Sequence, residues 1–261
     1  MRDLPVPSDM LLTAQRNIGF FLQTFYSLFI DGWEVLGAPP TGETEEQRLK
    51  RLISEKEGFI QASLVILFNS AEIYLKSKIA DKSVFLLLKD IKDAGRNVSF
   101  FDCVTIDAKD LPNIYEGISG LTLSRTFKKS YESLRTERNK VIHLGKSNSI
   151  SIRKDLIIAF LSLSEEIVRK PIVDITEILI SEAQAMSTTE IHDAKEEFSG
   201  TIVSILRKFF PIDEIIKETY ELTNIPQSWI QCARCQNKVD TLAVISRKKS
   251  LCLSCGIKNG V

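Results

Sequence analysis

The sequence predicts an all-α chain, formed by a helical bundle, a helical extension and a small cysteine-rich module at the C-terminus. Three observations lead to this prediction. Long segments repeat apolar residues at the spacing of an amphipathic helix, and proline or glycine residues separate those segments. Four of the five cysteines form two Cys-x-x-Cys pairs near the C-terminus, where the helical pattern ends. We therefore expect three regions, over residues 1–170, 171–227 and 228–261.

The first half of the bundle is expected to contain two long helices. The first covers residues 9–35, with Ser8 as its N-cap, and a glycine and two prolines end it. The second covers 44–78 and can break near Gly58. A short helix is expected over 82–92.

The second half of the bundle is expected to begin with an irregular connection over 93–121, long enough to shape a substrate groove. The next helix begins at Thr122 or Ser124 and ends at Gly145, a glycine placed as a helix C-terminal cap. A turn follows, and another helix covers 152–170 before a proline. Together the long helices predict a four-helix bundle.

The extension is expected to hold three further helical segments. The first covers 173–186, and the second begins at a capping-box pattern over 187–190 and runs to about Phe210. The last covers 212–222. From Ser228 onward the helical signal weakens, which predicts a different kind of module.

Composition indicates an ordinary globular protein, with 44% hydrophobic and 26% charged residues in a chain of 261. The formal net charge of zero hides two basic segments. Residues 121–155 contain nine basic and three acidic side chains, and residues 228–261 contain six basic and one acidic. Such segments favour a polyanion such as nucleic acid, although basic helix faces are often simply solvated.

The N-terminal residues carry no signal-peptide pattern, because Arg2 and Asp3 are followed by two early prolines. The most apolar stretch, over 18–30, contains Gln23 and is too short to span a bilayer. Together with cysteines at metal-binding spacing, these features predict a cytoplasmic location and no membrane partner.

The cysteine pairs predict a structural Zn²⁺ site. Cys232 and Cys235 are separated from Cys252 and Cys255 by sixteen residues, a spacing found in four-cysteine zinc sites. Four thiolates complete a tetrahedral site and leave no open position for catalysis. The module therefore resembles a zinc ribbon.

The function of this ribbon is open between two readings. Its basic side chains can grip a nucleic-acid backbone while Trp229 stacks on a base. Equally, the ribbon can be a structural cap in which Trp229 packs at the hinge. The basic side chains concerned are Arg234, Lys238, Arg247, Lys248 and Lys249.

A cation interrupts the apolar stripe of the helix that ends at Gly145. Arg138 lies in the middle of this stripe, where an unpaired buried charge costs several kcal/mol. It therefore needs an anion. His143, which titrates near neutral pH, follows about 140° further around the same helix. The pair indicates phosphate chemistry. The apolar residues of the stripe are Phe127, Tyr131, Leu134, Val141 and Ile142.

The segment Arg138-Asn139-Lys140-Val141-Ile142-His143 resembles the Arg-x4-His motif of the HEPN superfamily, and Glu72-Ile73-Tyr74-Leu75-Lys76 resembles a pattern common in HEPN helices. The resemblance covers residues 11–170. It implies a HEPN-like helical bundle and a metal-independent endoribonuclease acting in antiphage defence or as a toxin. It also implies a homodimer that binds RNA at a shared active site, restrained by an antitoxin or associated with a defence protein.

The chemistry assigns a role to each of four residues. His143 can act as general acid or base, and Arg138 can bind phosphate oxygens. Asn139 shares a helix face with His143 and can orient it. Glu72 is expected to pair with Arg138. One motif supplies a single histidine, so the acid and the base of the reaction require two protomers.

A structural alternative assigns these residues no catalysis. Arg138 then forms a salt bridge with Glu72 or Glu137, and His143 interacts with the helix dipole. In that reading the chain is a non-catalytic HEPN dimer that binds nucleic acid or protein through its zinc ribbon.

Overall fold

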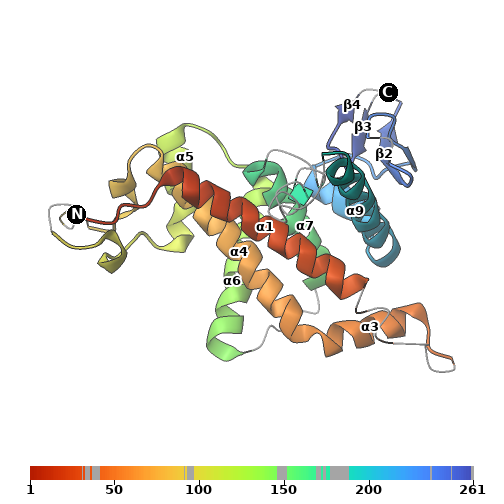
Figure 1. Cartoon of the computed structure of the whole chain (residues 1–261), viewed down its shortest axis with the longest axis horizontal. Helices are drawn as coiled ribbons and strands as arrows, with labels where there is room; N and C mark the ends of the chain where they lie inside the picture. The colour runs from red at the N-terminus through yellow and green to blue at the C-terminus, as the bar shows by residue number, and fades with distance from the viewer. Residues whose placement is uncertain are drawn as a thin grey trace.

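The computed structural model shows a mostly helical chain, as predicted, and adds a small C-terminal sheet (Figure 1). Helices α1, α4 and α6 run side by side, and the strands gather against α9, on the far side from the N-terminus (Figure 1). The described residues are 1–30, 32, 36, 42–90, 92, 97–145, 152–168, 172, 175–176, 188–235, 237–247 and 249–259.

Four helices form the bundle. Helix α4 packs between α1 and α6, and α7 closes the ring by contacting the other three. The core is rich in aromatic contacts, such as the stacked pair Phe21 and Phe160 at 5.1 Å and the tilted pair Phe68 and Tyr131 at 5.4 Å between centroids. The bundle helices are α1 (Pro7–Phe29), α4 (Glu57–Ala80), α6 (Arg125–Leu144) and α7 (Ile152–Ile167).

The first helix starts earlier than its sequence predicts. Pro7 occupies its first turn, and the residue before it, Val6, is the N-cap, so the prediction of Ser8 as the cap is wrong. Proline favours this position because its fixed φ suits the helix and its missing N–H is not needed there.

The expected break near Gly58 is confirmed. Helix α3 (Glu45–Glu55) begins with a capping box between Thr44 and Gln47, and Lys56 separates it from α4.

The prediction of a short helix over 82–92 is wrong. The described residues contain instead the 3-10 turn η1 (Val84–Leu87), and Leu88 then forms an isolated bridge with Thr105. Further 3-10 turns, η3 (Phe100–Asp102) and η4 (Ala108–Asp110), follow in the region expected to be irregular.

Sequence reasoning missed helix α5 (Leu111–Ser119), which packs against α4. The sequence predicts an irregular connection here, because proline and glycine often mark loops. Pro112 lies instead in the first turn, where a helix tolerates proline. Gly120 is the left-handed C-cap, with φ of 68°.

The ends of α6 are as predicted. The side chain of Ser124 accepts a hydrogen bond from the N–H of Phe127 at 3.0 Å. Gly145 adopts φ of 65°, which ends the helix in the left-handed conformation.

The extension contains α9 (Thr188–Phe209) and α10 (Ile212–Thr219) among its described residues. Helix α10 ends three residues before its expected end at residue 222. The turn expected over 147–151 and most of the helix expected over 173–186 lie outside the described residues, as does Ser187 of the expected capping box.

The C-terminal module, or ribbon, is a four-stranded antiparallel sheet in the order β1-β2-β3-β4. Its inward side chains, including Ala243 and Leu251, belong to the same hydrophobic core as the bundle. The ribbon is therefore packed onto the helices. The strands are β1 (Ser228–Gln231), β2 (Asp240–Ser246), β3 (Lys249–Cys252) and β4 (Lys258–Asn259).

Helix α4 is long and apolar enough to cross a membrane by length and composition, and it is the one described helix with this property. Half of its most apolar window is buried. Its neighbours α1, α5 and α6 cover it, as expected for the central helix of a bundle.

Candidate metal centre and candidate anion site

The two cysteine pairs meet at one end of the ribbon. All four Sγ atoms lie within 4.8 Å of one another. The distance from Cys232 to Cys255 is 3.7 Å, and that from Cys235 to Cys252 is 3.9 Å. Tetrahedral Zn²⁺ with Zn–S bonds of about 2.3 Å places its sulfur atoms about 3.8 Å apart. The cluster thus has the spacing of a four-coordinate metal site.

The electrostatics of the cluster also favour a cation. The hydrogen bond with Cys252 lowers the pKa of the Cys235 thiol well below its usual range, and the same bond raises the pKa of Cys252 to about 11. One deprotonated thiol therefore makes the next one harder to ionise. A cation removes this conflict, because it stabilises all four thiolates together.

The loops around the cluster contact α9 directly. Ser254, within the second cysteine pair, is hydrogen-bonded to Ser199 at 2.8 Å. Asn237, two residues after Cys235, donates to the carbonyl of Glu196 at 2.7 Å. A Cβ added at Gly200 would lie 2.3 Å from Oδ1 of Asn237, so any other residue here would displace the Asn237 side chain. Sequence reasoning missed these contacts, since no motif links α9 to the ribbon.

The side chain of Trp229 in β1 contacts residues of α9 and α10. Its Nε1 donates to Asp213 at 2.8 Å, and the guanidinium of Arg207 lies 5.0 Å from its ring centroid. Arg207 also donates to the carbonyl of Asp240 at 3.0 Å. These contacts agree with a structural position of Trp229 at the hinge rather than with a ring offered to a base.

Apart from Lys258, which pairs with Glu165, the described exposed basic side chains of the ribbon form two separate groups. Arg234 and Lys238 lie beside the cysteine cluster, whereas Arg247 and Lys249 lie at the turn between β2 and β3. Strand β2 joins the two groups and spans about 20 Å. Lys248 lies outside the described residues. The ribbon therefore presents two basic ends.

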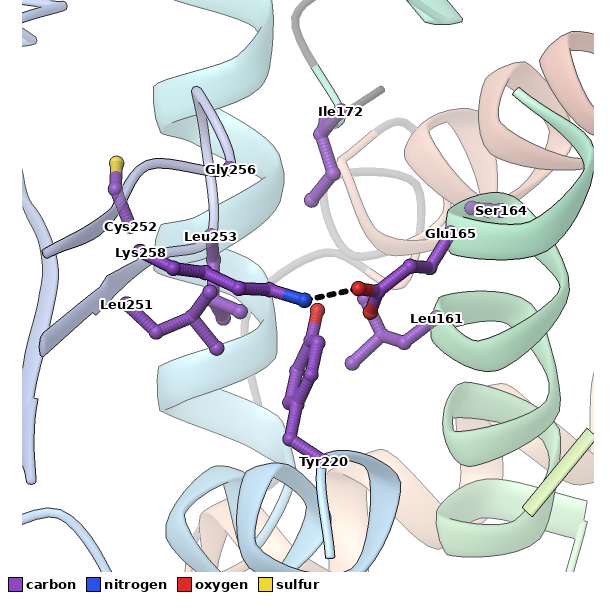
Figure 2. A pocket seen from close by; sticks show the side chains of 10 residues that line it. All are labelled: Leu161, Ser164, Glu165, Ile172, Tyr220, Leu251, Cys252, Leu253, Gly256 and Lys258. Atoms are coloured by element: carbon purple, nitrogen blue, oxygen red, sulfur yellow. Dashed lines mark hydrogen bonds and ion pairs between the residues drawn. The ribbon is translucent and has the colours of Figure 1, made fainter. Parts of the chain in front are cut away.

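A small cavity of about 90 Å³ lies where the ribbon meets α7 and α10 (Figure 2). The ion pair of Lys258 with Glu165 crosses it, and the hydroxyl of Tyr220 points toward this pair (Figure 2). Burial, followed by the charge of Glu165, raises the pKa of Tyr220. The remaining wall is mostly apolar, so the cavity is a seam between packed elements. Its apolar lining includes Leu161, Ile172, Leu251 and Leu253.

Arg138 lies half-buried between α6 and α4. Its guanidinium carbon is 5.6 Å from the ring centroid of Phe68, and one terminal nitrogen donates to Oδ1 of Asn139 at 3.1 Å. Its Nε is buried and has no hydrogen-bond partner. Within the described part of the chain, no carboxylate forms an ion pair with it. The guanidinium is therefore held in place, and no carboxylate of the described residues is paired with it.

The expected pairing of Glu72 with Arg138 is wrong. Glu72 accepts instead from Lys76 at 2.6 Å, one turn along the same helix. The structural alternative also named Glu137, which pairs with Lys140 at 2.6 Å. Both carboxylates bind a lysine within one turn, because such local pairs need no tertiary alignment.

His143 lies exposed in the last turn of α6. Its neighbours Ile142 and Leu144 are also exposed, at 51% and 73%. Across the described residues, no hydrogen bond joins His143 to Arg138 or Asn139. Asn139 contacts Arg138, which differs from the expectation that it orients the histidine. Within one chain, Arg138 and His143 thus do not meet, as the helix geometry predicts.

The comparisons with known proteins return no match to a family model, to a curated protein or to a solved structure.

Proposed function

We propose that the chain is a cytoplasmic, metal-independent endoribonuclease of HEPN type that acts in antiphage defence or as a toxin. One observation carries the proposal. The Arg138 guanidinium is fixed by Phe68 and Asn139 while its charge has no protein counterion among the described residues. A preorganised, uncompensated arginine suits a phosphate group, because its planar fork matches two phosphate oxygens.

The proposed reaction divides the work between Arg138 and His143. A histidine removes the proton of a ribose 2′-OH, and that oxygen attacks the adjacent phosphorus. Arg138 stabilises the additional negative charge on the phosphate oxygens. A second histidine protonates the leaving 5′-oxygen, which yields a 2′,3′-cyclic phosphate and a free 5′-hydroxyl.

The second histidine comes from a second copy of the chain in this proposal. His143 is flanked by the exposed apolar side chains Ile142 and Leu144 at the end of α6. Contact between two such ends around a two-fold axis buries these side chains and brings two His143 rings into one site. An antitoxin or a defence partner would act by covering the same surface.

The metal that the cysteine cluster holds is Zn²⁺ in this proposal. The cluster is closed by four sulfur ligands and lies in the ribbon, away from the Arg-x4-His motif, so its role is structural. The residues that would hold the ion are Cys232, Cys235, Cys252 and Cys255.

The function is tested by incubating the full-length protein with RNA in excess EDTA. We expect cleavage that leaves 2′,3′-cyclic phosphate ends and is lost in His143→Ala and Arg138→Ala. Arg135→Ala is the matched control, since Arg135 lies one turn away but is paired with Glu132 at 2.6 Å. The zinc content is measured in parallel, so that loss of the ribbon metal is not mistaken for loss of catalysis.

A non-catalytic binding module is the second candidate. It is favoured by the exposed basic side chains at both ends of the ribbon, such as Arg234 and Arg247. Intact RNA after every incubation, together with RNA binding that weakens in Arg234→Ala or Arg247→Ala, would assign the chain to this class instead.

A further inference from the structure

We propose that Phe68 is the positioning residue of the anion site, holding the Arg138 guanidinium by its aromatic face in the place expected for a carboxylate. The identity of the anion, an RNA phosphodiester, rests on the proposed function. The positioning itself rests on the packing of α4 against α6.

The ring of Phe68 is itself fixed. Its side chain is fully buried in the bundle core. Tyr131 of α6 packs against it with 5.4 Å between ring centroids, and the hydroxyl of Tyr131 donates to the carbonyl of Ala108 at 2.8 Å. Two helices and a connecting segment therefore determine where the ring lies and where the guanidinium can rest on it.

An aromatic partner has an electrostatic consequence that a carboxylate does not. The ring attracts the cation through its quadrupole and carries no formal negative charge. Glu72, the carboxylate expected to fill this role, pairs with Lys76. The full positive charge of Arg138 thus stays available to an incoming anion.

The hydrogen-bond inventory of Arg138 supports the same inference. A guanidinium has five N–H donors. Within the described part of the chain, one of them donates to a protein acceptor, Oδ1 of Asn139. The unpartnered Nε is buried. The remaining donors on the two terminal nitrogens, rather than the buried Nε, suit a tetrahedral oxyanion with two or more acceptor oxygens, such as a phosphodiester.

The test replaces Phe68 by a ring-fluorinated phenylalanine, which keeps the shape and withdraws electron density from the face. The matched control carries the same residue at Phe127, which is also fully buried and stacks on Tyr131 at 6.3 Å, without a contact to Arg138. A second pair, Phe68→Leu and Phe127→Leu, removes each ring. Circular dichroism verifies that each variant is folded.

The first readout is the NMR order parameter of the Arg138 Nε–H group in the RNA-free protein. We expect fluorination or loss of the ring at position 68 to increase its mobility, and changes at position 127 to leave it unaltered. The second readout is binding of a 2′-O-methyl RNA, which cannot be cleaved by 2′-OH attack. We expect about tenfold weaker binding for the position 68 variants.

If the order parameter of Arg138 is unchanged in both position 68 variants, the positioning role of Phe68 is overturned, whether or not the protein binds or cleaves RNA. Altered order in a protein that never cleaves RNA supports the positioning role and removes the endoribonuclease proposal. The two failures are thus separate, because the first readout involves no substrate.

Discussion

At the residue scale, the surroundings of Arg138 are the main evidence about the Arg-x4-His motif. Its position in an apolar stripe is visible in the sequence and predicts an anionic partner, whereas the structure leaves its Nε buried with no partner among the described residues. An uncompensated cation lowers the stability of the fold and is useful when an anion binds. Phe68, Asn139 and the pairing of Glu72 with Lys76 together maintain this state.

Arg138→Met should therefore leave the free energy of unfolding unchanged or raise it by about 1 kcal/mol, because it removes a poorly compensated charge and keeps the buried volume. Urea denaturation measures this change. Arg135→Met is the control, and it should be neutral or slightly destabilising since it loses the ion pair with Glu132. A loss of more than about 1 kcal/mol in Arg138→Met would argue that the charge is compensated in the folded protein.

At the element scale, α9 and the ribbon depend on one another. The loops that carry the cysteines provide Ser254 and Asn237 for contacts to α9, and the inner face of the sheet joins the bundle core. A metal that fixes these loops would therefore also stabilise α9, although α9 supplies no ligand to the metal. Lys258 adds a further tie, through Glu165 of α7.

Removal of the metal with a strong chelator should increase amide hydrogen exchange in β2, β3 and α9, while α1 and α4 remain protected. Added Zn²⁺ should restore protection. Exchange that rises in the strands alone would show that α9 is stable without the ribbon.

A second effect at this scale is the pH dependence of the junction between α5 and α6. Glu116 accepts from the N–H of Leu123 at 2.8 Å and from Lys128 at 3.1 Å. The backbone bond, followed by the lysine bond, lowers the pKa of Glu116 below its usual 4.5. The resulting stabilisation is complete above about pH 4.5 and is lost as the pH falls through the folded-state pKa.

Exchange of the Leu123 amide should consequently be slow at pH 6 and should accelerate, beyond its intrinsic pH dependence, as the carboxyl is protonated below pH 4.5. In Glu116→Gln this additional acceleration should be absent. A wild-type profile that matches the variant would refute the role of the carboxylate.

At the scale of the whole molecule, the exposed end of α6 is the surface expected to join two copies. Leu144→Glu places a charge on this surface and should convert a dimer to a monomer, measured by light scattering during size-exclusion chromatography. Phe101→Glu is the control, because Phe101 is equally exposed at 75% but belongs to a different segment. A monomeric wild type, or a dimer that persists in Leu144→Glu, would remove the shared site from the proposal.

The sequence by itself determined features that depend on local chemistry. Cysteine spacing located the cluster of four cysteines, Ser124 and Gly145 defined both ends of α6, and apolar periodicity predicted the long helices. It failed in residues 82–121, where Pro112 and Gly120 were compatible with either a loop or a capped helix. Local patterns cannot separate these outcomes, because packing against α4 decides between them.

The tertiary structure alone decided which side chains that are distant in the sequence contact one another. It placed Phe68, and not the expected Glu72, against the Arg138 guanidinium, and it brought Trp229 to Asp213. Each of these outcomes depends on the relative position of two helices, or of a helix and a strand. A side chain that reaches several partners selects one by geometry and desolvation, and neither is encoded in the spacing of residues along the chain.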